Sequence, residues 1–129
     1  KEMIIVTSKN HRSNTLENLI NRINFKKKIT MGSIGCKIAS IIRGESDIYI
    51  SLTTPNKSSP KDWDFAAPEA ILKTAGGSLT NLNNDELSYG GSNFEQGGII
   101  VATSGKISHK SICSQIMQVI RKFDLYPFD

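Results

Sequence analysis

Short apolar strands that alternate with amphipathic helices are the feature of this 129-residue chain that most restricts its fold. Runs of β-branched or alternating apolar residues predict strands at 3–7, 28–31, 47–52, 78–82 and 99–103. Helical spacing separates most of these runs, as in Leu16, Leu19, Ile20 and Ile23. Continuous Ile-rich strands need cover on both faces of a sheet. We therefore expect an α/β fold, with a mostly parallel five-stranded sheet flanked by helices.

Four helices are expected from their apolar spacing and end signals. The first begins at Asn14, the second follows the turn at 32–35, the third runs from near 62–64 to Gly76, and the last opens at Ser104. The short connections favour parallel, right-handed crossovers for the first three strand–helix units.

Composition restricts the class of protein. With 38% hydrophobic and 22% charged residues, residues 1–129 read as one globular domain. Cys36 and Cys113 lie in apolar runs without metal-binding spacing, so we expect two buried, reduced thiols and a cytoplasmic protein. No apolar run approaches the ~20 residues that cross a bilayer, so no membrane partner is expected.

The charge balance concerns the ligand. A net charge of +4 suits an anion without identifying one. The densest basic run, residues 26–28, lacks the interleaved aromatic residues of a nucleic-acid patch. We therefore expect no nucleic acid polymer as a partner.

Loops that follow parallel strands meet at one edge of a sheet, where α/β proteins bind ligands. The first such loop carries His11, the second carries Ser33, Gly35 and Lys37, and the third leads to Asp64. Each precedes a helix, whose N-terminal N–H groups and dipole favour phosphate. The spacing of a P-loop is absent, so an ordinary helix cap explains the second loop as simply as phosphate binding does. An exposed loop histidine without a role likewise explains His11.

Asp64 has two interpretations. Aspartate at a helix start is most often an N-cap. A carboxylate held ionised by the helix dipole can also bind a hard cation such as Mg²⁺, although such cations take several oxygen ligands. No other acidic residue is expected to converge on Asp64.

Residues 63–67, WDFAA, followed by Ala75-Gly76-Gly77, resemble the WDxAA…AGG signature of the inositol monophosphatase family. Residues 31–37 and 44–49 are similar to the GSxGxK…GxxDxY stretch upstream of that signature. Residues 8–12 resemble a loop of the family's 3′(2′),5′-bisphosphate nucleotidase branch. The resemblance covers nearly the whole chain and is most secure over 31–77.

This resemblance implies a Mg²⁺-dependent, lithium-sensitive phosphomonoesterase, a hydrolase built as a layered α/β/α/β/α sandwich. The chain is similar to the carboxyl-terminal half of that sandwich. Asp64 takes the role of catalytic metal ligand, while Ser33, Gly35, Lys37 and, in the nucleotidase branch, His11 take roles in substrate binding. The implied mechanism is metal-assisted in-line attack of water on phosphorus.

The family's DPxDGT motif and its upstream metal-binding Glu are absent. We therefore expect a fragment that lacks the amino-terminal half of the same enzyme and is inactive alone. The favoured substrate is 3′-phosphoadenosine 5′-phosphate, although Ser51 stands near a position where nucleotidases often carry Arg. A phosphatase of inositol monophosphate or sugar phosphates and a noncatalytic nucleotide-binding domain remain alternatives, and a homodimer stays open.

Overall fold

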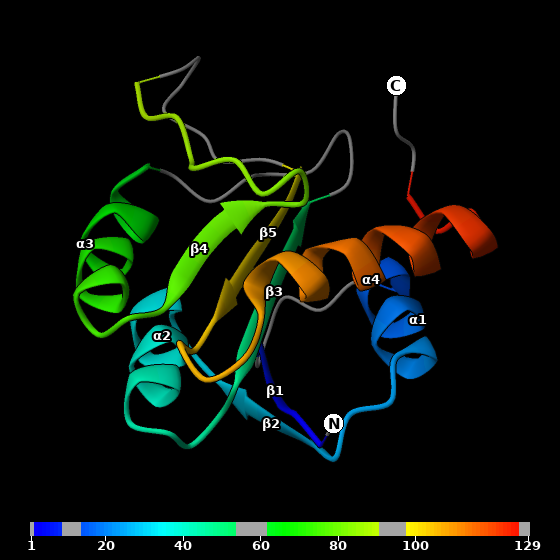
Figure 1. Cartoon of the computed structure of the whole chain (residues 1–129), viewed down its shortest axis with the longest axis horizontal. Helices are drawn as coiled ribbons and strands as arrows, with labels where there is room; N and C mark the ends of the chain where they lie inside the picture. The colour runs from blue at the N-terminus through cyan, green and yellow to red at the C-terminus, as the bar shows by residue number, and fades with distance from the viewer. Residues whose placement is uncertain (1, 9–13, 54–61, 91–97, 127–129) are drawn as a thin grey trace.

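The structure, a computed structural model, describes residues 2–8, 14–53, 62–90 and 98–126 as three layers, with two helices on each face of one sheet (Figure 1). The elements in chain order are β1 (Ile4–Ser8), α1 (Asn14–Arg22), β2 (Lys27–Met31), α2 (Ile34–Ile42), β3 (Ile48–Thr53), α3 (Asp62–Thr74), β4 (Ser78–Asn81), β5 (Gly98–Thr103) and α4 (His109–Phe123). The predicted α/β class and five-stranded sheet are confirmed. Within the described residues, no helix has the length and apolar character to cross a membrane.

The sheet is mixed, so the prediction of a mostly parallel sheet is wrong. Its strand order is β2-β1-β3-β5-β4. β1 pairs in parallel with β2 and β3, whereas β5 runs antiparallel to both β3 and β4. A parallel pair needs a crossover, but no helix lies between β4 and β5, and the chain simply reverses. β1, β2, β3 and β4 nevertheless share one direction, so their carboxyl ends lie at one edge.

The strand order explains which face each helix covers. β2 and β3 lie on opposite sides of β1, so two right-handed crossovers place α1 and α2 on opposite faces. Successive residues of a strand also point to opposite faces. Ile5 packs in the core with α1 and α4, whereas the adjacent Val6 packs in the core with α2 and α3 (Figure 1). Both residues are fully buried.

Two details differ from the sequence prediction. α4 begins at His109 rather than at Ser104, because the side chain of Ser108 accepts a hydrogen bond from the backbone N–H of Ser111 at 3.3 Å and caps the helix. Both cysteines are free, and Cys113 is buried, but Cys36 is exposed. Cys36 lies on the outer side of the first turn of α2, so the prediction of a buried thiol is wrong there.

The two glycines after α3 are required by the packing. Gly76 has φ +87°, a left-handed conformation that few other residues adopt without strain. Gly77 leaves no room for a side chain, because an added Cβ would lie 2.6 Å from the carbonyl oxygen of Thr103 and 2.5 Å from Cδ1 of Leu72. The end of α3 is thereby packed against the end of β5.

A buried histidine links α4 to the sheet. His109 lies between the hydroxyl groups of Thr80 on β4, 2.6 Å from Nε2, and Thr103 on β5, 2.8 Å from Nδ1. The hydroxyl of Thr80 donates to the carbonyl of Asn81 at 2.8 Å, so its oxygen is left to accept from Nε2–H. This arrangement holds a neutral ring, and burial lowers the pKa of His109 from its ordinary value of 6.5.

The lowered pKa predicts acid-sensitive stability. The unfolded chain takes up a proton on His109 at a higher pH than the folded chain does. The contribution of His109 to stability is therefore complete above about pH 6.5 and is lost as the pH falls toward the lower, folded-state pKa. Urea unfolding of the wild type and of His109→Gln should show a smaller loss of stability between pH 7.5 and 5 in the variant. Equal losses would contradict the assignment.

Candidate functional site

The start of α2 lies at the edge where the parallel strands end. Ser33 is its N-cap, and its hydroxyl oxygen accepts a hydrogen bond from the backbone N–H of Cys36 at 3.0 Å. Its φ of +36° is unusual for a residue with a side chain. A Cβ added to Gly32 or Gly35 would meet no atom of the described chain within 4 Å. The helix start therefore borders open space, and the backbone N–H groups of Ile34 and Gly35 have no partner within the helix.

Lys37, one turn further along α2, is buried against the sheet and only 3% exposed. Its ammonium donates to the hydroxyl of Ser8, the last residue of β1, at 3.0 Å. The same nitrogen lies 5.1 Å from the ring centre of Tyr49 on β3, within cation–π range. No ion pair joins Lys37 to a carboxylate among the residues described. Burial lowers the pKa of Lys37, because removal from water disfavours the charged form.

Asp64 reaches the same region from α3. It is the third residue of the helix, so it lies inside the first turn and the interpretation as an N-cap is wrong. Burial raises the pKa of Tyr49 to about 12, the Ser51 hydroxyl that hydrogen bonds to Tyr49 acts in the opposite direction, and the charge of Asp64 adds to the rise. Asp64 is therefore close enough to Tyr49 for their charges to interact.

We call Ser8, Lys37, Tyr49, Ser51 and Asp64 the edge cluster. All five lie on the face of the sheet that α2 and α3 cover, toward the carboxyl ends of β1 and β3. The fold thus brings two of the predicted residues to one region, with the start of α2 at the same edge of the sheet. Ser8 and Tyr49 were not predicted, because only the pairing of β1 with β3 makes them neighbours. His11 lies outside the described residues.

The edge cluster does not complete a metal site by itself. The described part of the chain contains no group of three or more His, Cys, Asp or Glu side chains that could hold a metal ion. Mg²⁺ prefers an octahedral set of oxygen ligands, usually with several waters and at least one carboxylate. Asp64 can supply one such ligand, and any further protein ligand has to come from other residues.

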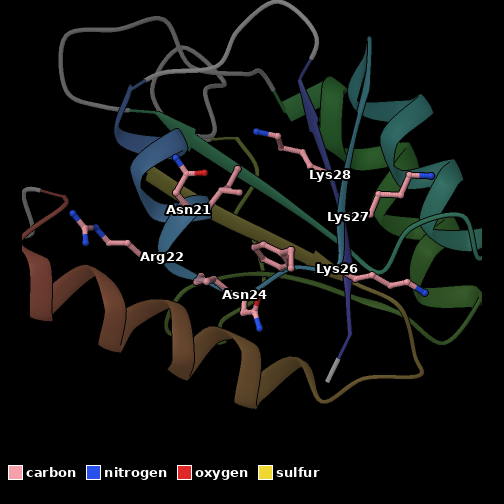
Figure 2. Close-up of a pocket in the computed structure, with 9 residues that line it drawn as sticks. Asn21, Arg22, Asn24, Lys26, Lys27 and Lys28 are labelled. Carbon is pink, nitrogen blue, oxygen red and sulfur yellow. The ribbon is translucent and has the colours of Figure 1, made fainter.

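A separate hollow of about 430 Å³ lies at the opposite edge of the sheet, between the end of α1 and the start of β2 (Figure 2). Its basic side chains already have partners. Lys26 pairs with Glu2 at 3.9 Å and Lys28 with Glu17 at 3.2 Å. Arg22 lies 4.1 Å from the ring centre of Phe123. We therefore assign this hollow no role in binding a substrate.

Comparison with known sequences gives a consistent result. A profile described as "Inositol monophosphatase family" matches residues 2–121. The chain is 33% identical over 88 residues to 3′(2′),5′-bisphosphate nucleotidase 1 of Mus musculus, which covers 67% of this chain and 27% of the mouse protein. It is 28% identical over 129 residues to inositol monophosphatase 3 of Xenopus laevis, covering 93% of this chain and 34% of that protein. The chain thus spans only about a third of the length of these relatives.

Solved structures share the fold. The inositol monophosphatase of Thermotoga maritima superposes with a TM-score of 0.68 at 20% identity, over 94% of this chain and 42% of that one. CysQ of Bacteroides thetaiotaomicron, described as a bacterial member of the inositol monophosphatase family, gives a TM-score of 0.67 at 24% identity, over 81% of this chain and 38% of that one. By its profile match and its fold, the chain belongs to the inositol monophosphatase family, whose members are Mg²⁺-dependent phosphomonoesterases, and corresponds to their carboxyl-terminal part.

Proposed function

We propose that this chain forms the carboxyl-terminal part of a Mg²⁺-dependent phosphomonoesterase and that its edge cluster contributes to the phosphate site. In this proposal Asp64 supplies one carboxylate ligand to the metal. The start of α2, with Ser33 and Gly35, offers backbone N–H groups to the anionic substrate. Lys37 stabilises the substrate's negative charge from beneath the strand edge.

The observation that carries the proposal is the burial of the Lys37 ammonium opposite a neutral hydroxyl. A buried charge is costly unless an opposite charge or several hydrogen bonds compensate it. Among the described residues, Lys37 has only the Ser8 hydroxyl and the ring of Tyr49 beside it. A bound anion at this edge would compensate the charge, which gives this lysine a reason to be retained at a buried position.

The favoured substrate is 3′-phosphoadenosine 5′-phosphate. The mouse nucleotidase and the Xenopus inositol monophosphatase lie at 33% and 28% identity, a narrow margin. The feature that favours the nucleotidase branch is the loop of residues 8–12 with His11, which resembles that branch. An inositol or sugar phosphate is the alternative substrate. A noncatalytic nucleotide-binding role is a second candidate function, because Asp64 alone does not make a metal site.

Our first functional prediction separates binding from stability at Lys37. Lys37→Met keeps a long unbranched side chain but removes the buried charge. The free energy of unfolding should stay unchanged or rise by about 1 to 4 kcal/mol in urea unfolding. Lys28→Met is the matched control. It removes a partly exposed ion pair with Glu17 and should cost no more than about 1 kcal/mol.

In an active enzyme that contains this chain, Lys37→Met should weaken binding of the phosphorylated substrate by roughly 10- to 100-fold. A suitable enzyme is a chimera in which the chain replaces the matching part of the mouse nucleotidase. If the substitution instead lowers the stability of the chain strongly and leaves KM and Kd unchanged, Lys37 holds β1 and α2 together and does not bind substrate.

A second prediction concerns Asp64. The 129-residue chain alone should release no phosphate from 3′-phosphoadenosine 5′-phosphate with Mg²⁺ present, because one carboxylate cannot assemble the site. In the chimera, Asp64→Asn should lower turnover more than about 100-fold, since a metal ligand contributes several kcal/mol to transition-state stabilisation. Unchanged turnover and Mg²⁺ dependence would exclude Asp64 as a ligand. Full activity of the isolated chain would show that its own residues complete the site.

A third prediction distinguishes the two substrates. In the same chimera, His11→Ala should impair hydrolysis of the adenosine bisphosphate much more than hydrolysis of inositol monophosphate. Steady-state kcat/KM for both substrates provides the measurement. Equal effects on the two substrates would remove the reason for preferring the nucleotidase branch and leave the broader phosphatase proposal in place.

A further inference from the structure

The two helix layers have outer surfaces of opposite character. The layer of α1 and α4 exposes polar side chains at Asn14, Asn18, Asn21, Arg22, Lys110, Ser111, Ser114, Gln115, Gln118, Arg121 and Lys122. Phe123, at the end of α4, is the exposed large apolar residue of these two helices. Such a surface is typical of helices that face water.

The outer surface of α2 and α3 is apolar instead. Trp63 is 66% exposed and Ile71 is 58% exposed. We define the α2–α3 face as the exposed residues Cys36, Ile42, Trp63, Ala66, Ala67, Ala70 and Ile71. The exposed positions of α2 carry no charge, and Lys73 is the charged residue at an exposed position of α3 between 63 and 74. The sides of these helices that face the sheet are apolar too, with Ile38, Ile41 and Phe65 buried.

A helix that is apolar on both sides is normally covered on both sides. Exposed apolar patches of several large side chains mark surfaces that contact another protein segment. The α2–α3 face is therefore a middle layer that lacks its second cover. Figure 1 shows these two helices together on one side of the sheet, away from α1 and α4.

We propose that the α2–α3 face docks the amino-terminal part of an inositol monophosphatase-family fold, through an apolar surface with acidic residues at its rim. This inference rests on the proposed function. The chain spans 27% and 34% of two curated relatives, so those proteins contain ample additional chain to cover the face. The position of Asp64 identifies the occupant more closely. Its single carboxylate needs further ligands, and it lies next to Trp63, so a segment that covers Trp63 is placed to bring acidic side chains beside Asp64.

The test uses the isolated chain and the chimera with the mouse nucleotidase. Ile71→Glu introduces a charge into the face more than one helical turn from Asp64. Phe123→Glu is the matched control, an exposed apolar residue of the other layer, 42% exposed and next to Arg22. Thermal unfolding of all variants is compared in both proteins.

We expect Ile71→Glu to shift the Tm of the isolated chain by less than about 2 °C and to lower that of the chimera by at least about 5 °C. Phe123→Glu should change neither by more than about 2 °C. An equal response to Ile71→Glu in both proteins overturns the proposal. So does a chimera that fails to fold, or that unfolds in two independent transitions, since the face then does not accept that partner.

The alternative occupant, a second copy of the chain, is tested with Trp63, the only tryptophan in the sequence. Iodide should quench its fluorescence efficiently in the isolated chain, with no dependence on protein concentration. Shielding that grows with concentration and disappears in Ile71→Glu would show self-association through this face and overturn the proposal. A chimera that shows the expected Tm pattern but no phosphatase activity would leave the docking surface standing and refute the proposed function alone.

Discussion

The need to cover a sheet that is apolar on both sides governs this structure. β5 is buried along almost its whole length, and its residues alternate between the two helix layers. The strands that flank it are held by the backbone at their ends. Asp47 accepts from the backbone N–H of Ile4 through its carboxylate at 2.8 Å, and its carbonyl accepts from the N–H of Ser104 at 3.1 Å. One residue therefore connects the start of β1 to the residues just before β3 and after β5.

The site depends on this arrangement of strands. Lys37 reaches Ser8 because α2 crosses back over β1 on its way from β2 to β3. Tyr49 lies beside the same ammonium because β3 pairs directly with β1. The cluster thus forms at the point where consecutive strands diverge to opposite sides of β1, which is where open α/β sheets bind ligands.

The sequence predicted the elements better than their arrangement. All five strands were expected within a few residues, because β-branched runs that are buried on both faces leave a clear pattern. The reversal of β5 left no such signal, since apolar strands look alike in either direction. α4 starts later than expected because Ser108, rather than Ser104, makes the capping bond. Within the site, Asp64 and Lys37 were found by motif, whereas Ser8 and Tyr49 are contacts between segments about 40 residues apart, which local patterns do not encode.

The Ala-Gly-Gly that ends α3 also limits what a family signature can say about activity. Gly76 is fixed by its backbone conformation and Gly77 by the lack of space beside Thr103. Neither glycine has a part in the proposed chemistry, so selection for folding alone suffices to retain them. A descendant that lost Asp64, and with it catalysis, would still need both glycines. In genome surveys this half of the signature therefore marks the architecture, and only the Trp-Asp half distinguishes working phosphatases from inactive copies.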